Sequence, residues 1–306
     1  MNLFLYIFFY FFLLFSIIGF GNLLQKLFFK DHEISIGYLG FFGIFLLLII
    51  SYALNIFIPL SSNINFIILI IGFIFFIEFL FKNNLEKGND ILLILTIFTL
   101  LIVFVLTAKN HDDFPYYHFE YIHLITKSPS AFGIGIFNHG FRTHCSIFYL
   151  SSLFYLPKAE YNLIHIASVF FLGFANFIFV KKIYVNLKNK DNLYIILLSL
   201  FSLVLANVFF YRMAEHGTDR SAQIVFLIVI VEILQLINRT NFDKLLFNKI
   251  IILITIAISL KAFYIIYLLL ILPVIYYENE KIKFILQIFK NKIFYLCSFL
   301  FFLFVS

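Results

Sequence analysis

The sequence predicts an all-α, polytopic transmembrane protein with about eight or nine spans and short membrane-surface helices in one long external segment. Its 306 residues are 63% hydrophobic and 12% charged, and the mean hydropathy is +1.04. Apolar runs recur along the chain, and a helix needs about 20 such residues to cross a bilayer. Most of the 47 phenylalanines are therefore expected to face lipid or to pack between helices.

The first expected span covers about 3–21 and is retained, because it lacks the early basic region and the small-residue cleavage site of a signal peptide. The later expected spans cover about 36–59, 64–81, 91–107, 161–180, 192–211, 221–237 and 250–277. A last apolar run of 14 residues begins at 293 and would measure about 21 Å as a helix. Because this run is shorter than a span, we interpret 1–306 as one integral membrane domain, from a fragment or from a chain that lacks its C-terminal continuation.

Lysine and arginine indicate the orientation, because cytoplasmic loops hold an excess of them. Alternate loops hold eleven of these residues in one set and six in the other, which places the 108–160 segment outside. The lysines between 278 and 292 disagree with this alternation. Either 250–277, with its unusual length and its central Lys261, is not a simple crossing, or 278–292 is an interfacial amphipathic helix. We expect a multi-pass protein of the bacterial cytoplasmic (inner) membrane.

Titratable residues are concentrated in the external segment, most densely at 111–123, which reads HDDFPYYHFEYIH. Asp112 or Asp113 is placed to cap a helix whose first turn contains Pro115, where the missing N–H costs nothing. Capping requires only one of the two carboxylates. The other carboxylate therefore suggests chemistry at this position.

The second carboxylate is interpreted as a general base or as a ligand of a divalent cation. Oxygen ligands favour Mg²⁺ or Mn²⁺, with Asp112 and Asp113 as the candidate ligands. Zinc is disfavoured, because the spacing of five between His118 and His123 does not match the usual zinc patterns. The candidate catalytic residues are Asp112, Asp113, His118 and Asp219.

Two further segments carry groups suited to a phosphate-bearing substrate. Residues 131–144 contain three glycines, which permit close backbone approach, and an arginine whose planar fork matches phosphate oxygens. A flexible loop is the alternative interpretation of this segment. The loop 212–220 is expected on the same face of the membrane. The candidate substrate-binding and phosphate-binding residues are His139, Arg142, His144, Arg212, His216 and Arg220.

The segment 145–160 begins with an apolar run that is too short to span a bilayer. We therefore expect a short re-entrant or surface helix beside the site. Cys145 is external in this topology and Cys297 lies in an apolar run, so a disulfide between them is not expected.

Ionisable residues inside spans are hypotheses of function in their own right. Glu232 and Lys261 lie deep in the seventh and eighth spans, where they are placed to pair with each other. Glu78 lies close to a span end and is expected to extend its carboxylate toward the membrane surface. His165 is interpreted as a hydrogen-bonded interfacial residue.

The motifs HDDFPYYH (111–118), NHGFRTH (138–144) and GTD (217–219) resemble those of a group of bacterial multi-pass membrane proteins without an established activity. An external acidic pair with surrounding tyrosines and histidines, short membrane-surface helices and a second external acidic loop also resemble the GT-C glycosyltransferases. That second resemblance implies a sugar donor linked to polyprenyl phosphate, used at the outer face of the membrane. It implies that Asp112 or Asp113 is the catalytic carboxylate and that Arg142 contacts phosphate.

The function expected from the sequence is transfer of a sugar from a lipid-phosphate donor, with the bilayer and a polyprenyl-phosphate-linked sugar as partners. A surface-polysaccharide polymerase or ligase is the alternative, since it would also handle a lipid diphosphate with Arg and His. A transporter or flippase is disfavoured, because most expected spans carry no ionisable residue. No nucleic-acid motif is present, and lysines in cytoplasmic loops account for the net charge of +6. The sequence carries no signal of oligomeric state.

Overall fold

The computed structural model describes residues 1–306 apart from 31, 82–84, 107–111, 131–132, 137, 143–144, 191, 210–217, 240–241, 279–285, 287 and 306. This described part is helical, and it contains no β-strand beyond one isolated bridge between Leu156 and Glu160. Six of its helices are long and apolar enough to cross a membrane, and three shorter apolar helices accompany them. The predicted class is therefore confirmed: the chain is an all-α membrane protein.

The N-terminal part consists of four long helices, α1 (Leu3–Phe28), α2 (Ile36–Asn55), α3 (Ser62–Phe81) and α4 (Leu85–Leu106). Helix α1 packs against both α2 and α3. A Cβ atom on Gly19 would lie 1.8 Å from the carbonyl oxygen of Gly72, and one on Gly43 would lie 1.8 Å from that of Ile17. Glycine therefore permits this packing, because small residues let helices approach closely in a membrane.

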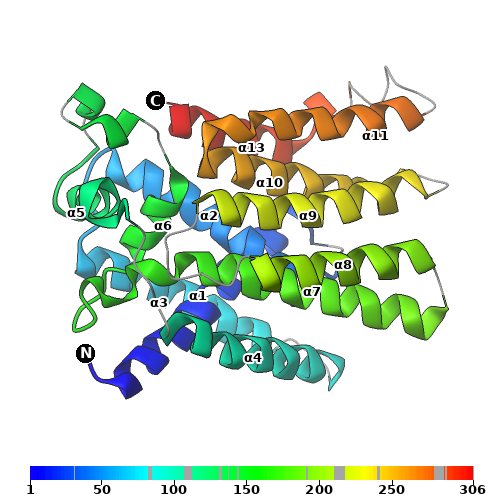
Figure 1. The fold of residues 1–306 in the computed structure, drawn as a ribbon, viewed down its shortest axis with the longest axis horizontal. Coiled ribbons are helices and arrows are strands. Elements are labelled where there is room, and N and C mark those ends of the chain that lie inside the picture. Colours follow the sequence, from blue (N-terminus) through cyan, green and yellow to red (C-terminus); the bar gives the residue numbers. More distant parts are fainter. Residues whose placement is uncertain are drawn as a thin grey trace.

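Short helices follow α4 at one end of the bundle, here called the α5 end (Figure 1). The π-helix η1 (Phe114–His118) continues directly into α5 (Phe119–Lys127). Two 3₁₀ turns, η2 (Ile134–Ile136) and η3 (His139–Arg142), precede α6 (Ser146–Leu153) and η4 (Tyr161–Ile166). All eight residues of α6 are buried. The predicted short helix is thus confirmed, and it lies inside the protein instead of on its surface.

Two buried asparagines hold these short helices against the long ones. The side-chain amide of Asn55, the last residue of α2, donates to the carbonyl oxygens of Ile125 and Ser128, at 3.2 Å each. The amide of Asn65 in α3 donates to the carbonyl oxygen of Ser152 at 2.7 Å. Buried carbonyl groups need such partners, so α2 and α3 fix the positions of the ends of α5 and α6.

The C-terminal part begins with α7 (Ala167–Asn189), α8 (Leu193–Phe209), α9 (Thr218–Ile237) and α10 (Lys244–Leu260). It continues with the 3₁₀ helix η5 (Ala262–Leu270), α11 (Ile271–Tyr277) and α13 (Lys292–Val305). Each of the expected spans up to 221–237 corresponds to one long helix. The expected span 250–277 does not.

The run 250–277 breaks at Lys261, whose backbone is extended with φ −160° and ψ 128°. Beyond the break, η5 and α11 return beside α10 and α9 (Figure 1). Nine 3₁₀ and seven α-helical residues measure about 28 Å, close to the roughly 30 Å hydrocarbon core of a bilayer. Of the two alternatives left by the sequence, the structure supports the first: this run is not a simple crossing.

The long helices run back and forth between the α5 end and the opposite end of the bundle (Figure 1). Ion pairs connect helices toward the opposite end, Lys26 with Glu78 and Lys181 with Asp90. Glu78 lies in the last turn of α3, close to a span end as expected. At the α5 end the hydroxyl group of Tyr6 lies 3.1 Å from Nε2 of His165, so His165 is hydrogen-bonded as expected.

Candidate functional site

The first part of the candidate site is the beginning of η1 at the α5 end. Asp113 occupies the N-cap position, and its backbone oxygen accepts hydrogen bonds from the amides of Tyr116 and Tyr117 at 3.2 Å and of His118 at 3.4 Å. The predicted helix start with Pro115 in its first turn is confirmed. Asp113 thus takes the predicted N-cap position, but its side chain makes no capping bond.

The Asp113 carboxylate instead accepts a hydrogen bond from the phenol of Tyr117, with 3.3 Å between the oxygens. This geometry follows from helical spacing, since residues four apart lie on the same face. Gly140 of η3 packs directly on the Tyr117 ring, and a Cβ there would lie 2.3 Å from its Cγ atom. The NHGFRTH motif therefore supports the position of Tyr117 through its glycine.

The second part of the site joins α9 to the break after α10. Nζ of Lys261 lies 3.0 Å from both carboxylate oxygens of Asp219, in the first turn of α9. The phenol of Tyr264 donates to the same carboxylate at 3.0 Å and also lies 3.4 Å from the Asp219 carbonyl oxygen. One carboxylate thus holds one ammonium and one phenol at the extended residue between two helices.

Helix α6 supports this break from the protein interior. The thiol of Cys145 donates to the carbonyl oxygen of Leu260 at 2.6 Å, and the hydroxyls of Ser146 and Ser259 lie 3.0 Å apart. Irregular backbone at membrane depth persists where protein groups satisfy it or where it lines a polar cavity. The end of α10 is therefore fixed by specific contacts.

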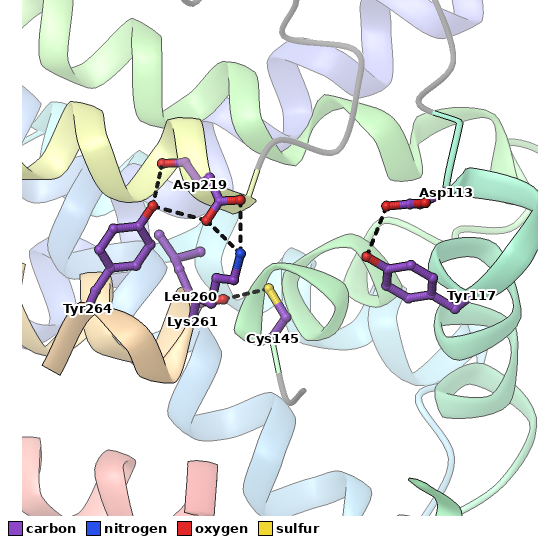
Figure 2. A network of polar contacts seen from close by, with 7 residues as sticks. All are labelled: Asp113, Tyr117, Cys145, Asp219, Leu260, Lys261 and Tyr264. Carbon is purple, nitrogen blue, oxygen red and sulfur yellow. Dashed lines mark hydrogen bonds and ion pairs between the residues drawn. The ribbon is translucent and has the colours of Figure 1, made fainter. Parts of the chain in front are cut away.

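The two parts lie on either side of Cys145 at the α5 end (Figure 2). Burial raises the pKa of Tyr117 to about 12, and the charges of Asp113, Cys145 and Asp219 contribute in the same direction. Burial also raises the pKa of the Cys145 thiol to about 12; Asp219 raises it further, while Lys261 and the Ile147 backbone amide lower it. The carboxylates of Asp113 and Asp219, far apart in sequence, thus both raise the pKa of Tyr117.

The other predicted catalytic residues differ in their surroundings. Asp112 is exposed in the turn before η1. His118 is buried, and its ring packs at centroid distances of 4.3 Å from Tyr117 and 5.0 Å from Phe148. This burial disagrees with direct contact between His118 and a substrate, and it assigns the residue to the packing beneath the site.

Among the predicted phosphate-binding residues, His139 and Arg142 are exposed in η3. The Nε group of Arg142 donates to the carbonyl oxygen of Gly135 at 3.1 Å, so this arginine contacts its own loop. Arg220 is half-buried in the first turn of α9, next to Asp219. His144, Arg212 and His216 lie outside the described residues. Among the described residues, no group of three or more His, Cys, Asp or Glu side chains is placed to hold a metal ion.

Sequence reasoning missed Tyr264 and misassigned Lys261. The predicted pair between Glu232 and Lys261 is wrong, because Lys261 binds Asp219. Glu232 instead pairs with Lys182 of α7 at 2.8 Å and accepts a hydrogen bond from Tyr38 of α2. The sequence signal for a break at Lys261 is the length of the apolar run 250–277. This run is longer than one span needs and has a single charge near its middle.

The fold and the site define an all-α membrane protein with a half-exposed polar cluster at one end of its helix bundle. A family model described as a domain of unknown function (DUF8201) matches residues 1–305. The chain therefore belongs to that family. Comparison with curated proteins and with solved structures gave no match.

Proposed function

We propose that the protein is a GT-C-like glycosyltransferase, which transfers a sugar from a lipid-phosphate donor at the extracytoplasmic face of a bacterial inner membrane. The observation that carries the proposal is that the Asp113–Tyr117 pair and the Asp219–Lys261 pair lie on either side of Cys145, at the same end of a membrane-embedded bundle (Figure 2). The α5 end then supplies a base, a cation and apolar helices for the donor lipid, which are the groups that the reaction requires.

Charge distribution supports this orientation. Described lysines at the opposite end, including Lys26, Lys188 and Lys190, are those expected of a cytoplasmic face. The return of η5 and α11 adds Lys290 and Lys292 to that end (Figure 1). We accordingly infer ten crossings, more than the eight or nine expected: α1, α2, α3, α4, α7, α8, α9, α10, η5 with α11, and α13. The α5 end is then extracytoplasmic.

In the proposed reaction the Asp113 carboxylate takes the proton of an acceptor hydroxyl. The acceptor oxygen forms a bond to the anomeric carbon of the sugar, and the bond from that carbon to the phosphate oxygen breaks. The lipid phosphate leaves with the electron pair of the broken bond, so a nearby cation lowers the barrier by stabilising the charge that develops. If Mg²⁺ or Mn²⁺ takes part, Asp112 and Asp113 are the carboxylates that would hold it.

The proposal is tested in cells that lack the protein and express either the wild type or Asp113→Asn. Asn keeps the size of the side chain and accepts the Tyr117 hydrogen bond, but it is not a base. We expect radiolabelled lipid-linked sugar to accumulate in the deletion strain and in Asp113→Asn, and to be consumed in wild type. Glu160→Gln, an exposed carboxylate at the same end, is the control and should behave as wild type. Normal consumption by a well-inserted Asp113→Asn protein would contradict the assignment.

A further inference from the structure

The break at Lys261 has two features that resemble a binding site for the head of an anionic lipid. Lys261 and Asp219 have side-chain exposures of 42% and 49%, so the ammonium is accessible. Immediately after it, η5 turns apolar side chains outward, including Phe263 at 70% and Leu269 at 58% exposure. A cation above an apolar membrane-facing helix matches an amphiphile with an anionic head and a hydrocarbon chain.

The contacts of Asp219 indicate how an oxyanion would be bound. Two oxygens of one carboxylate receive the Lys261 ammonium at equal distances of 3.0 Å, and one of them also receives the Tyr264 phenol at 3.0 Å. Phosphate oxygens accept the same donors. The phosphodiester of a lipid-linked sugar carries one negative charge, as the carboxylate does, and the monoester left after sugar transfer carries about −1.5 to −2. The same ammonium and phenol could therefore donate to the oxygens of a phosphate in place of the Asp219 carboxylate.

Exchange of one anion for the other is energetically accessible. Half-exposed ion pairs contribute only about 0 to 1 kcal/mol in typical cases, so an incoming phosphate can displace Asp219 at little cost. The Cys145 and Ser146 contacts hold the end of α10 in place independently of the ion pair.

We propose that Lys261 and Tyr264 bind the phosphate of a prenyl-type lipid, and that Asp219 occupies this site until the lipid displaces it. This inference rests on the proposed function, because it gives the donor phosphate its place and makes Asp219 a competitor in the resting state. Donor binding then releases the Asp219 carboxylate beside the reaction centre.

The test is equilibrium binding of radiolabelled farnesyl phosphate to the full-length protein in lipid nanodiscs. Lys261→Met should weaken binding by roughly tenfold or more, since it removes a charge-assisted contact. Asp219→Asn should tighten binding severalfold, because it removes the competing anion and leaves the cation. Lys292→Met at the opposite end is the matched control, with wild-type affinity expected.

Asp219→Asn is the most informative variant. If the ion pair only stabilises the fold, farnesyl phosphate should bind this variant with unchanged or lower affinity, and either result would overturn the proposal. Competition with unlabelled inorganic phosphate and with farnesol separates the sources of affinity. Competition by inorganic phosphate at the same concentrations as farnesyl phosphate would exclude a lipid ligand in favour of a free oxyanion. The assay involves no sugar transfer. Loss of transfer in Asp113→Asn without tighter binding in Asp219→Asn would therefore reject this inference alone.

Discussion

Two clusters in this protein use the same three kinds of side chain, a carboxylate, a lysine and a tyrosine, at opposite ends of the helix bundle. At the α5 end Asp219 binds Lys261 and Tyr264. Toward the opposite end Glu232 binds Lys182 and Tyr38, and the Lys249 ammonium lies 4.4 Å from the centre of the Tyr38 ring. We call these the outer cluster and the inner cluster.

The clusters differ in accessibility. The side chains of Asp219 and Lys261 are 49% and 42% exposed, whereas those of Glu232 and Lys182 are 1% and 14% exposed. A buried charge is costly unless it keeps its partner, so the inner cluster is expected to join α2, α7 and α9 permanently. An exposed pair loses little when it separates, so the outer cluster is suited to exchange its partners with a ligand.

The largest expected effect is that of breaking the inner cluster. Glu232→Gln leaves the Lys182 ammonium without its carboxylate in an interior position, which should cost about 3 to 5 kcal/mol of stability. Thermal unfolding of the purified protein in detergent measures this loss. The double variant with Lys182→Met removes both charges and should recover part of the stability. Wild-type stability of Glu232→Gln would contradict the contrast between the two clusters.

Breaking the outer cluster should have a much smaller effect on stability. Asp219→Asn and Lys261→Met are each expected to change the unfolding free energy by about 1 kcal/mol or less, since both side chains are already half-exposed. Thermal unfolding in detergent measures the stability of both variants relative to wild type. A loss as large as that of Glu232→Gln would mean that the outer ion pair holds the fold together and is not free to exchange.

The fold was largely predictable, because its signals are local. Apolar runs near 20 residues predict helices wherever they occur, and the runs at 36–59, 64–81 and 221–237 each became one. Asp113 followed by Pro115 correctly predicted a helix start. The run after Cys145 was correctly predicted as a helix too short to span.

The partners of the charged side chains were not predictable in the same way. Which lysine meets Glu232 depends on the depth and rotation of three helices, and Lys261 was assigned to it only because both residues lay inside spans. The break at Lys261 carries neither glycine nor proline, the usual local signals of a helix end. Likewise Asp113 satisfied the local rule for capping, but its carboxylate binds Tyr117 instead. The outer cluster is therefore a tertiary feature, of which the sequence indicated single members.

The smallest expected effect tests whether the charge of Asp219 changes the pKa of Tyr117, on the other side of the candidate site. The Tyr117 pKa is raised from its ordinary value of 10.0 to about 12, first by burial and then by Asp113, with a smaller contribution from Asp219. The fold therefore favours the neutral phenol, and this contribution to stability is complete below pH 10 and is lost as the pH rises toward 12.

Asp113→Asn removes the nearest negative charge and should lower the Tyr117 pKa toward 10, while burial keeps it above that value. Asp219→Asn should lower it less, and Glu232→Gln in the inner cluster should leave it unchanged. Tyrosinate absorbance during alkaline titration measures the shift, with Tyr117→Phe identifying the signal of this residue. If Asp219→Asn and Glu232→Gln change the Tyr117 pKa equally, the charge of the outer cluster has no specific effect on Tyr117. Asp113 and Asp219 would then not share one site.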